Sequence, residues 1–298
     1  MTTLTPTTDA KVAAIEHRRG SRVWHVIRRD PLAMMSLMII GIFLIIAIFA
    51  PILAPYPEQG AGKSSPKTLY LPPSLEHPFG TDELGRDVLS RVMYGARPAF
   101  IVPLVVVALA VAIGAPLGAI AGYKGGWIDE VIMRVTDLFL AFPSLLLAMA
   151  ITAALGRGLE NAAIALIISW WPWYTRLVRG IAVSLRERPF VEAAQSIGVR
   201  DSVIIFRHIL PNSISPILVQ VTVDMGTVIL VAGGLAFIGL GTQPPDADWG
   251  LMISTGRTAV LNQWWISLFP ALAIFILILA FNLLGDVLRD ILDPRQYQ

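Results

Sequence analysis

A short stretch in the first quarter of the chain carries residue types that bind phosphate in other proteins. It runs from Gly60 to Ser65 and reads GAGKSS, with Gly62, Lys63 and Ser64 in the order that ends a phosphate-binding loop. The full motif requires another glycine five positions before Gly62, where this chain has Pro57. No strand–helix unit is predicted around the stretch, so we do not expect it to bind ATP.

Other side chains that catalyse reactions or bind metals are scarce. The sequence has no cysteine, which excludes thiolate chemistry, disulfides and cysteine metal sites. Its four histidines are scattered without the spacing of a helical metal site, and the motifs HExxH, GxSxG and GxGxxG are missing. We therefore predict no metal site, no cofactor bound by this chain and no catalytic residue. An intramembrane enzyme is disfavoured because no predicted span contains a histidine.

One carboxylate lies inside an otherwise apolar block. Asp224 is placed well within the run from Ser215 to Leu240. A charged side chain at that depth is costly and usually faces the interior of a helix bundle or a water-filled path. Two roles for Asp224 are equally open, lining a translocation path and making a buried structural hydrogen bond.

The apolar blocks around these residues are typical of a membrane protein. The 298 residues are 55% hydrophobic and 15% charged, whereas soluble domains average about 25% charged residues. Runs of roughly 20 apolar residues match the thickness of a bilayer. A net charge of +2 gives no indication of a nucleic-acid partner. We predict an all-α, polytopic membrane protein with six transmembrane helices, near Leu32–Leu53, Ala99–Gly122, Val135–Leu155, Ala162–Ile181, Ser215–Leu240 and Trp265–Leu284.

The distribution of Lys and Arg predicts the orientation of the spans. Residues 1–31 are polar and Arg-rich. The apolar run that follows is longer than the roughly 7–15 residues of a secretory signal, so it is interpreted as a retained membrane anchor. With the N-terminus in the cytoplasm, the inner segments hold 16 Lys and Arg residues and the outer segments hold 7. Both termini are therefore predicted to be cytoplasmic.

The second predicted span has a glycine at every fourth position. Gly114, Gly118 and Gly122 form a double small-xxx-small repeat, which lets two helix backbones approach closely. Packing against another helix of the same chain is the favoured interpretation. Contact with a second subunit is the alternative.

The loop before that span ends in a segment with a regular charge pattern, HPFGTDELGRDVLSRVMYGAR from His77 to Arg97. Thr81 or Asp82 could cap a helix there. Asp82–Arg86 and Asp87–Arg91 have the i,i+4 spacing of stabilising ion pairs, and apolar residues share one face. We predict an amphipathic helix on the outer surface of the membrane.

A polar segment, EAAQSIGVRDSVIIFRHILPN, separates the fourth and fifth predicted spans. Pro189 suits the first position of a helix, and Glu192 then falls in the first turn, where the helix dipole favours an acid. Gly198 is a natural left-handed stop, and Asp201 or Ser202 could cap a second helix that Pro211 ends. Two short cytoplasmic helices at an angle are predicted. A loop without a partner would not need this capping chemistry, so a docking element is favoured.

This polar segment resembles the EAA signature of the integral membrane subunits of binding-protein-dependent ABC importers. The residues that carry this resemblance are Glu192, Ala193, Ala194, Gly198, Leu210 and Pro211. The stretch from His77 to Arg97 is similar to the hallmark of the dipeptide/oligopeptide/nickel branch, in its C-type subunit. Further matches are Gln243-Pro244-Pro245, Trp249-Gly250, the GDVLRD run from Gly285 to Asp290, and Asp293-Pro294. The resemblance covers nearly the whole chain from about Asp30.

The resemblance implies the type I ABC importer permease fold in a prokaryotic plasma (inner) membrane. A cytoplasmic tail (1–31) precedes the first span and an extracytoplasmic loop (32–98). The transmembrane domain (99–290) carries coupling helices at 189–211, and a cytoplasmic tail (291–298) follows. In that family, the EAA segment inserts into a cleft of a cytoplasmic ATPase.

The resemblance also implies partners and sites. The partners are a homologous B-type permease in a heterodimer, two ABC ATPases that bind ATP and Mg, an extracytoplasmic solute-binding protein, and membrane lipid. Asp224 is the candidate for the translocation path. The residues expected to face the binding protein are Asp82, Arg86, Asp87, Gln243, Pro244, Pro245 and Trp249.

The cargo implied by the resemblance is a di- or oligopeptide. Closely similar subunits serve nickel complexes, opines, glutathione and oligosaccharides, and these alternatives stay open. A secondary transporter or channel is a less favoured class, because Asp224 is the one candidate ion-coupling group and no inverted repeat of broken spans is seen.

Overall fold

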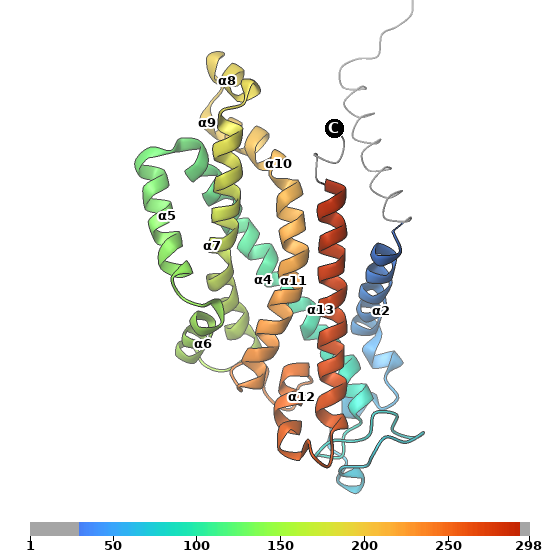
Figure 1. Cartoon of the computed structure of the whole chain (residues 1–298). Helices are drawn as coiled ribbons and strands as arrows, with labels where there is room; N and C mark the ends of the chain where they lie inside the picture. The colour runs from blue at the N-terminus through green and yellow to red at the C-terminus, as the bar shows by residue number, and fades with distance from the viewer. Residues whose placement is uncertain (1–29, 293–298) are drawn as a thin grey trace, which may run out of the picture.

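A computed structural model describes residues 30–292, which form helices and loops with a single isolated bridge between Thr81 and Asp87. In Figure 1, α5, α7, α11, α13 and α2 run lengthwise through the molecule, and α4 crosses diagonally behind them. The helices are α2 (Pro31–Leu53), α3 (Pro57–Gly60), η1 (Pro66–Thr68), α4 (Val88–Lys124), α5 (Gly126–Leu140), α6 (Ser144–Leu155), α7 (Leu159–Arg186), α8 (Pro189–Ser196), α9 (Asp201–Ile204), η2 (Ile205–Ile209), α10 (Leu210–Asn212), α11 (Ile214–Phe237), α12 (Trp249–Gly256), η3 (Arg257–Ala259) and α13 (Trp265–Leu292).

Four described helices, α2, α4, α11 and α13, are long and apolar enough to cross a membrane, and the bent pair α5–α6 counts as a fifth if it forms one span. Helix α7 is 28 residues long and lies among them, but its sequence is less apolar. The count of six spans therefore stays a prediction. The prediction of an all-α chain with several apolar spans is confirmed.

The segment predicted as a span near Val135–Leu155 is not one continuous helix in the structure. The chain bends by 86° between α5 and α6. The break falls at Ala141–Pro143, and proline disfavours helical backbone in the residue before it. Pro143 itself adopts ψ 128°, outside the helical region.

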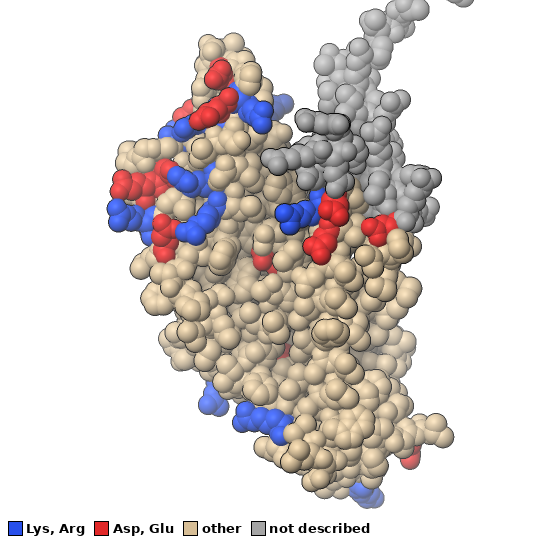
Figure 2. Space-filling model, viewed as in Figure 1, with Lys and Arg blue, Asp and Glu red and all other residues tan. Residues whose placement is uncertain are grey.

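The charged residues of the described chain lie at the two ends of the bundle. Figure 2 shows Lys, Arg, Asp and Glu concentrated at the end that carries α8 and α9, with few on the band between the ends. The start of α2 and the end of α13 lie at this same end (Figure 1). The two tails predicted to be cytoplasmic fall mostly outside the described residues, but the chain enters and leaves the bundle on one side.

The glycine repeat of α4 lies against α7. A Cβ atom added to Gly114, Gly118 or Gly122 would stand 2.3, 2.3 and 2.6 Å from the backbone oxygens of Trp171, Thr175 and Arg179. No side-chain movement can relieve a clash with backbone. The interpretation as packing within one chain is therefore confirmed, and these glycines bring α4 and α7 into backbone contact.

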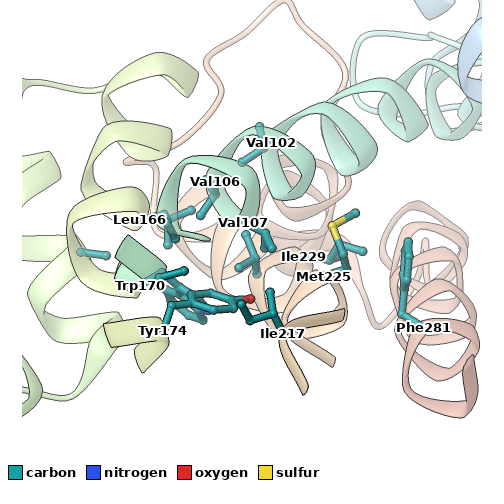
Figure 3. Close-up of a cluster of buried hydrophobic side chains, with 14 of the residues drawn as sticks. Val102, Val106, Val107, Leu166, Trp170, Tyr174, Ile217, Met225, Ile229 and Phe281 are labelled. Carbon is teal, nitrogen blue, oxygen red and sulfur yellow. The ribbon is translucent and has the colours of Figure 1, made fainter. Parts of the chain in front are cut away.

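The apolar core lies where α4, α7, α11 and α13 meet. Figure 3 shows Val102, Val106 and Val107 of α4 in one cluster with Leu166 and Trp170 of α7. All five side chains are buried. The α11 and α13 residues that complete this cluster are Ile217, Met225, Ile229 and Phe281.

We predict that Gly118→Leu destabilises the α4–α7 crossing. Overpacking in a protein core costs about 1–3 kcal/mol, and a clash with rigid backbone lies at the upper end of this range. The measurement is the midpoint of thermal unfolding of the purified transporter in detergent.

Gly41→Leu in α2 is the matched control, because a Cβ there meets nothing within 4 Å. Its midpoint is expected to stay within a degree or so of wild type. If the midpoint falls equally in both variants, the loss of stability does not come from the α4–α7 crossing and the prediction is wrong.

Candidate functional site

The first half of the predicted docking segment has the capping that its sequence indicates. Pro189 occupies the first turn of α8, and Glu192 lies in that turn. Gly198 has φ +78°, the left-handed region that favours glycine. Its N–H donates to Gln195 O (2.9 Å), and the N–H of Val199 donates to Ala194 O (3.1 Å). These two bonds form a Schellman motif, which fixes the end of α8.

The signature residues divide between the two sides of the segment. Glu192, Ala193, Gly198 and Pro211 are exposed, Leu210 is half-buried, and Ala194 is buried. Such a division leaves a face with small side chains open to a partner.

The second half of the segment differs from the prediction. Neither Asp201 nor Ser202 caps α9, whose N-cap residue is Arg200 without a side-chain cap bond. Pro211 does not end the helix either, because helical structure continues to Asn212 and only a turn at Ser213 precedes α11. Residues Ile205–Ile209 widen into a π-helix directly before Pro211, where a proline ring disfavours ordinary α-helical geometry.

An apolar tip on this segment was missed by the sequence interpretation. Phe190, Ile197, Val203 and Phe206 are exposed, with Ile197 81% and Phe206 57% accessible. Their elements form the projection at one end of the molecule (Figure 1), outside the bundle. Exposed aromatic and aliphatic side chains gathered on a projection are typical of a protein interface. The sequence does contain a sign of this surface, since large apolar residues occur within an otherwise polar stretch.

The segment is also bonded to the end of α4. The Tyr123 hydroxyl donates to Asp201 Oδ1 (3.0 Å) and accepts from Gln195 Nε2 (3.1 Å). Lys124 Nζ lies 2.5 Å from Asp201 Oδ2. The Lys124 ammonium, followed by the Tyr123 hydroxyl, holds the pKa of Asp201 below its usual value. The Asp201 contribution to stability is thus present above the unfolded carboxyl pKa, about 3.9, and is lost as the pH falls through the lower folded value.

At the opposite end, residues 77–87 form a loop where the sequence predicted an amphipathic helix. Helix α4 begins only at Val88, and its N-cap is Asp87, not Thr81 or Asp82. The Asp82–Arg86 ion pair exists at 2.7 Å, but it closes a turn in which Asp82 Oδ1 accepts from the N–H groups of Leu84 and Arg86. Because the Asp82 carboxylate accepts its hydrogen bonds within this turn, it does not cap a helix at this position.

Asp87 is the central residue of this loop. Its Oδ2 accepts from the N–H and the hydroxyl of Ser90 (2.8 and 2.7 Å), and its Oδ1 lies 2.9 Å from His77 Nδ1. Both His77 and Asp87 are buried. The predicted Asp87–Arg91 pair is absent from the described contacts, because Arg91 donates to the carbonyls of Pro245 and Asp246 (3.2 and 3.1 Å).

Two tryptophans join this loop to the C-terminal part of the chain. Trp249 Nε1 donates to Val92 O (2.8 Å), and Trp265 Nε1 donates to Thr81 O (3.1 Å). With the Arg91 bonds, they link residues more than 150 positions apart into one unit. Following the predicted orientation, we call this unit the outer platform: residues 54–97, 241–256 and the start of α13.

The prediction of residues that face a binding protein is partly corrected. Asp82, Arg86, Asp87 and Trp249 are buried, so they hold the platform together and do not form its surface. Within the predicted set, the exposed residues are Pro244 and Pro245, and Gln243 is half-buried.

Asp224 lies inside the bundle. Its side chain is buried, and Oδ1 accepts from Gln220 Nε2 (3.0 Å). Tyr174 and Trp170 of α7 are its neighbours. The arrangement contains one structural hydrogen bond, and the role of Asp224 in a translocation path stays a prediction.

The described residues offer no obvious place for a metal. Within residues 30–292, no three His, Cys, Asp or Glu side chains converge as ligands. The GAGKSS stretch follows the short helix α3, and Lys63 there pairs with Glu58 at 2.6 Å.

A bundle of apolar helices, with a capped and partly apolar projection at one end and a bonded loop platform at the other, fits a membrane permease subunit. The family described as "Binding-protein-dependent transport system inner membrane component" matches residues 114–297. The N-terminal TM domain of oligopeptide transport permease C matches residues 19–73, so the resemblance begins earlier than the predicted Asp30. The chain belongs to this family of ABC importer permease subunits of the bacterial plasma membrane.

Several curated relatives cover most of the chain. The dipeptide transport system permease protein DppC of Alkalihalophilus pseudofirmus is 47% identical over 90% of this chain and 88% of its own. The probable D,D-dipeptide transport system permease protein DdpC of Escherichia coli K12 is 44% identical over 93% and 92%. The glutathione transport system permease protein GsiD of Escherichia coli O157:H7 is 44% identical over 91% and 89%.

A solved structure shares the fold. The inward-facing MetNI methionine ABC transporter aligns with a TM-score of 0.54 at 17% identity, over 67% of this chain and 96% of its own. This likeness confirms the predicted type I importer permease fold.

We predict that Asp87→Ala destabilises the outer platform by about 2–4 kcal/mol. The change removes a helix cap, worth about 0.5–2 kcal/mol, and leaves the buried His77 and Ser90 groups without their acceptor, at about 1–3 kcal/mol. The measurement is the thermal unfolding midpoint of the purified transporter.

Asp30→Ala is the control, since Asp30 also caps a helix but at a partly exposed position. A shift in Asp87→Ala no larger than that of Asp30→Ala would refute the buried role of Asp87.

Proposed function

We propose that this chain forms half of the translocation path of an ATP-driven importer of di- or oligopeptides, and that residues 189–211 are its coupling element. The observation that carries the proposal is the projection of α8 to α10. It is fixed by a Schellman motif, carries exposed apolar side chains, and lies beyond the apolar band. An ATPase surface with a complementary apolar cleft fits this projection.

The coupling residues follow from this geometry. Glu192, in the first turn of α8, and the next residue Ala193 are exposed, and Gly198 lies at the turn between α8 and α9. Leu210 and Pro211 lie where the π-helix leads into α11. Force applied to the projection reaches α7 and α11 directly, because the segment connects these two helices.

The peptide cargo rests on the relatives. Three permeases at 44–47% identity serve a dipeptide, a D,D-dipeptide and glutathione, which is itself a tripeptide. All three cargoes are short peptides with free carboxylates. The binding protein, a separate chain, would make most of the selection among them.

The remaining partners follow from the family. Two ATPase subunits would bind ATP and Mg, and a homologous B-type permease would supply the other half of the path. The binding protein would dock on the outer platform, where Gln243, Pro244 and Pro245 form an accessible loop. Asp224 would line the path in the state that opens the bundle around it.

We expect Glu192→Lys and Gly198→Pro to weaken coupling between ATP hydrolysis and uptake. Lysine places a like charge at the positive end of α8, and proline cannot adopt the φ of +78° at position 198. In vesicles that contain the permease pair, the ATPases and the binding protein, ATP-driven uptake of a labelled dipeptide should fall about 5- to 150-fold, the range of ordinary coupling free energies.

Glu130→Lys is the charge-reversal control, because Glu130 is exposed at the same end but lies on α5. Wild-type uptake in the Glu192 and Gly198 variants would overturn the coupling assignment. The peptide cargo fails if wild-type vesicles respond to loaded binding protein yet accumulate no di- or tripeptide.

The orientation predicts a labelling pattern in intact cells. The chain has no cysteine, so single cysteines can be placed at the exposed Ser64 and Ser202. A membrane-impermeant maleimide should label Ser64→Cys and leave Ser202→Cys unlabelled until the cells are opened. The reverse pattern would place the projection outside the cell and refute cytoplasmic coupling.

A further inference from the structure

The projection is joined to the bundle by more than its chain connections to α7 and α11. The last two residues of α4 bond to the α8–α9 turn. Tyr123 bonds to Gln195 before the turn and to Asp201 after it, and Lys124 bonds to Asp201. Tyr123 is buried, and its hydroxyl is shared between the Asp201 carboxylate and the Gln195 amide. Two residues on either side of the Gly198 turn are thus held by one side chain of a distant helix. We call Tyr123, Lys124, Gln195 and Asp201 the α4 clamp.

The helix that carries the clamp reaches the other end of the molecule. Helix α4 is 37 residues long, and its first two turns are bonded to the platform. Arg91 donates to the carbonyls of Pro245 and Asp246, and the carbonyl of Val92 accepts from the Trp249 indole. Along its length, α4 crosses α7 in backbone contact. A single continuous helix therefore connects the projection with the outer platform.

We propose that the α4 clamp keeps the α8–α9 turn and α4 together through the transport cycle, so that α4 carries the movement of the projection to the outer platform. Tyr123 and Asp201 are positioning residues for coupling between the two ends. The proposal rests on the coupling role of residues 189–211.

The chemistry of the clamp suits this role. Lys124 and Asp201 are half-exposed, so water and salt weaken their ion pair. The Tyr123 side chain is buried, and the two bonds of its part-buried hydroxyl fix the direction of the contact. We therefore expect the hydroxyl to carry more of the coupling than the ammonium does.

The test uses the complete transporter with its ATPases, reconstituted in vesicles with binding protein. Tyr123→Phe, which lies on α4 outside residues 189–211, should leave the ATPases associated and their basal ATP hydrolysis intact. Asp201→Asn is the partner variant and is compared with it by stimulation alone. Stimulation of hydrolysis by loaded binding protein should fall about 5-fold or more, the lower range of allosteric coupling, and peptide uptake per ATP should fall with it. Glu130→Gln, in an exposed pair within α5, is the matched control and should behave as wild type.

A covalent version of the clamp separates coupling from mere stability. In the cysteine-free chain, Lys124→Cys with Asp201→Cys should lose stimulation and regain it when a short bis-maleimide bridges the two thiols. Loss of all uptake on bridging would overturn the proposal, because α4 and the turn would then need to separate. Loss of ATPase association in Tyr123→Phe would overturn it as well, since the clamp would then only shape the docking surface.

The experiments distinguish a failure of the clamp proposal from a failure of the coupling role assigned to residues 189–211. If Tyr123→Phe and Asp201→Asn keep wild-type stimulation while Glu192→Lys lowers uptake, the proposal is refuted and the coupling segment stands. If Glu192→Lys also keeps wild-type uptake, the coupling assignment itself is refuted, and the clamp with it.

Discussion

The close crossing of α4 and α7 is the constraint on which the bundle depends. At three successive turns, Gly118 and its two neighbours in the repeat leave no space for a side chain between α4 and the α7 backbone. Helices in a membrane gain little from apolar contact alone, because lipid is equally apolar, and close backbone packing supplies the attraction instead. Since α7 leads directly into α8, this crossing also sets where the projection stands relative to α4. The contacts of Tyr123 with Asp201 become possible only in this arrangement.

The outer platform follows a different principle. Three of its charged residues, Asp82, Arg86 and Asp87, are buried and paired, with Asp82 and Arg86 closing one turn and Asp87 capping α4. A buried charge is tolerated only when hydrogen bonds and an opposite charge compensate for its lost hydration. These buried side chains therefore serve internal bonds, and within the set predicted to face a binding protein the exposed residues are Pro244 and Pro245. The same i,i+4 spacing that is typical of a helix here produces a tight turn, because the Asp82 carboxylate bonds backbone N–H groups.

The sequence predicts features that depend on neighbouring residues and misses those that depend on distant ones. The stop at Gly198, the first turn with Glu192 and the apolar spans are local, and the structure has them. The contacts of Arg91 with Pro245 and of Tyr123 with Asp201 join positions 154 and 78 residues apart, and no periodicity reveals them. The family resemblance identifies the stretch from His77 to Arg97 as a contact region but does not say which of its side chains are buried. For this reason Asp82, Arg86 and Asp87 were expected on a surface.

The attachment of α2 shows how one proline and one distant cation can fix a peripheral helix. Pro51 has no N–H, so the Ala47 carbonyl four residues earlier has no donor within its helix. Arg97 of α4 supplies it, with Nε 2.9 Å from Ala47 O and a second nitrogen 3.3 Å from Ile48 O. A charge-assisted bond in an apolar environment is stronger than the same bond in water. Helix α2 belongs to the separately matched region 19–73, and most of its surface is open to lipid. The Arg97 guanidinium thus adds a directional bond to the packing of α2, whose Ala33, Ala47 and Ala50 are buried against its neighbours.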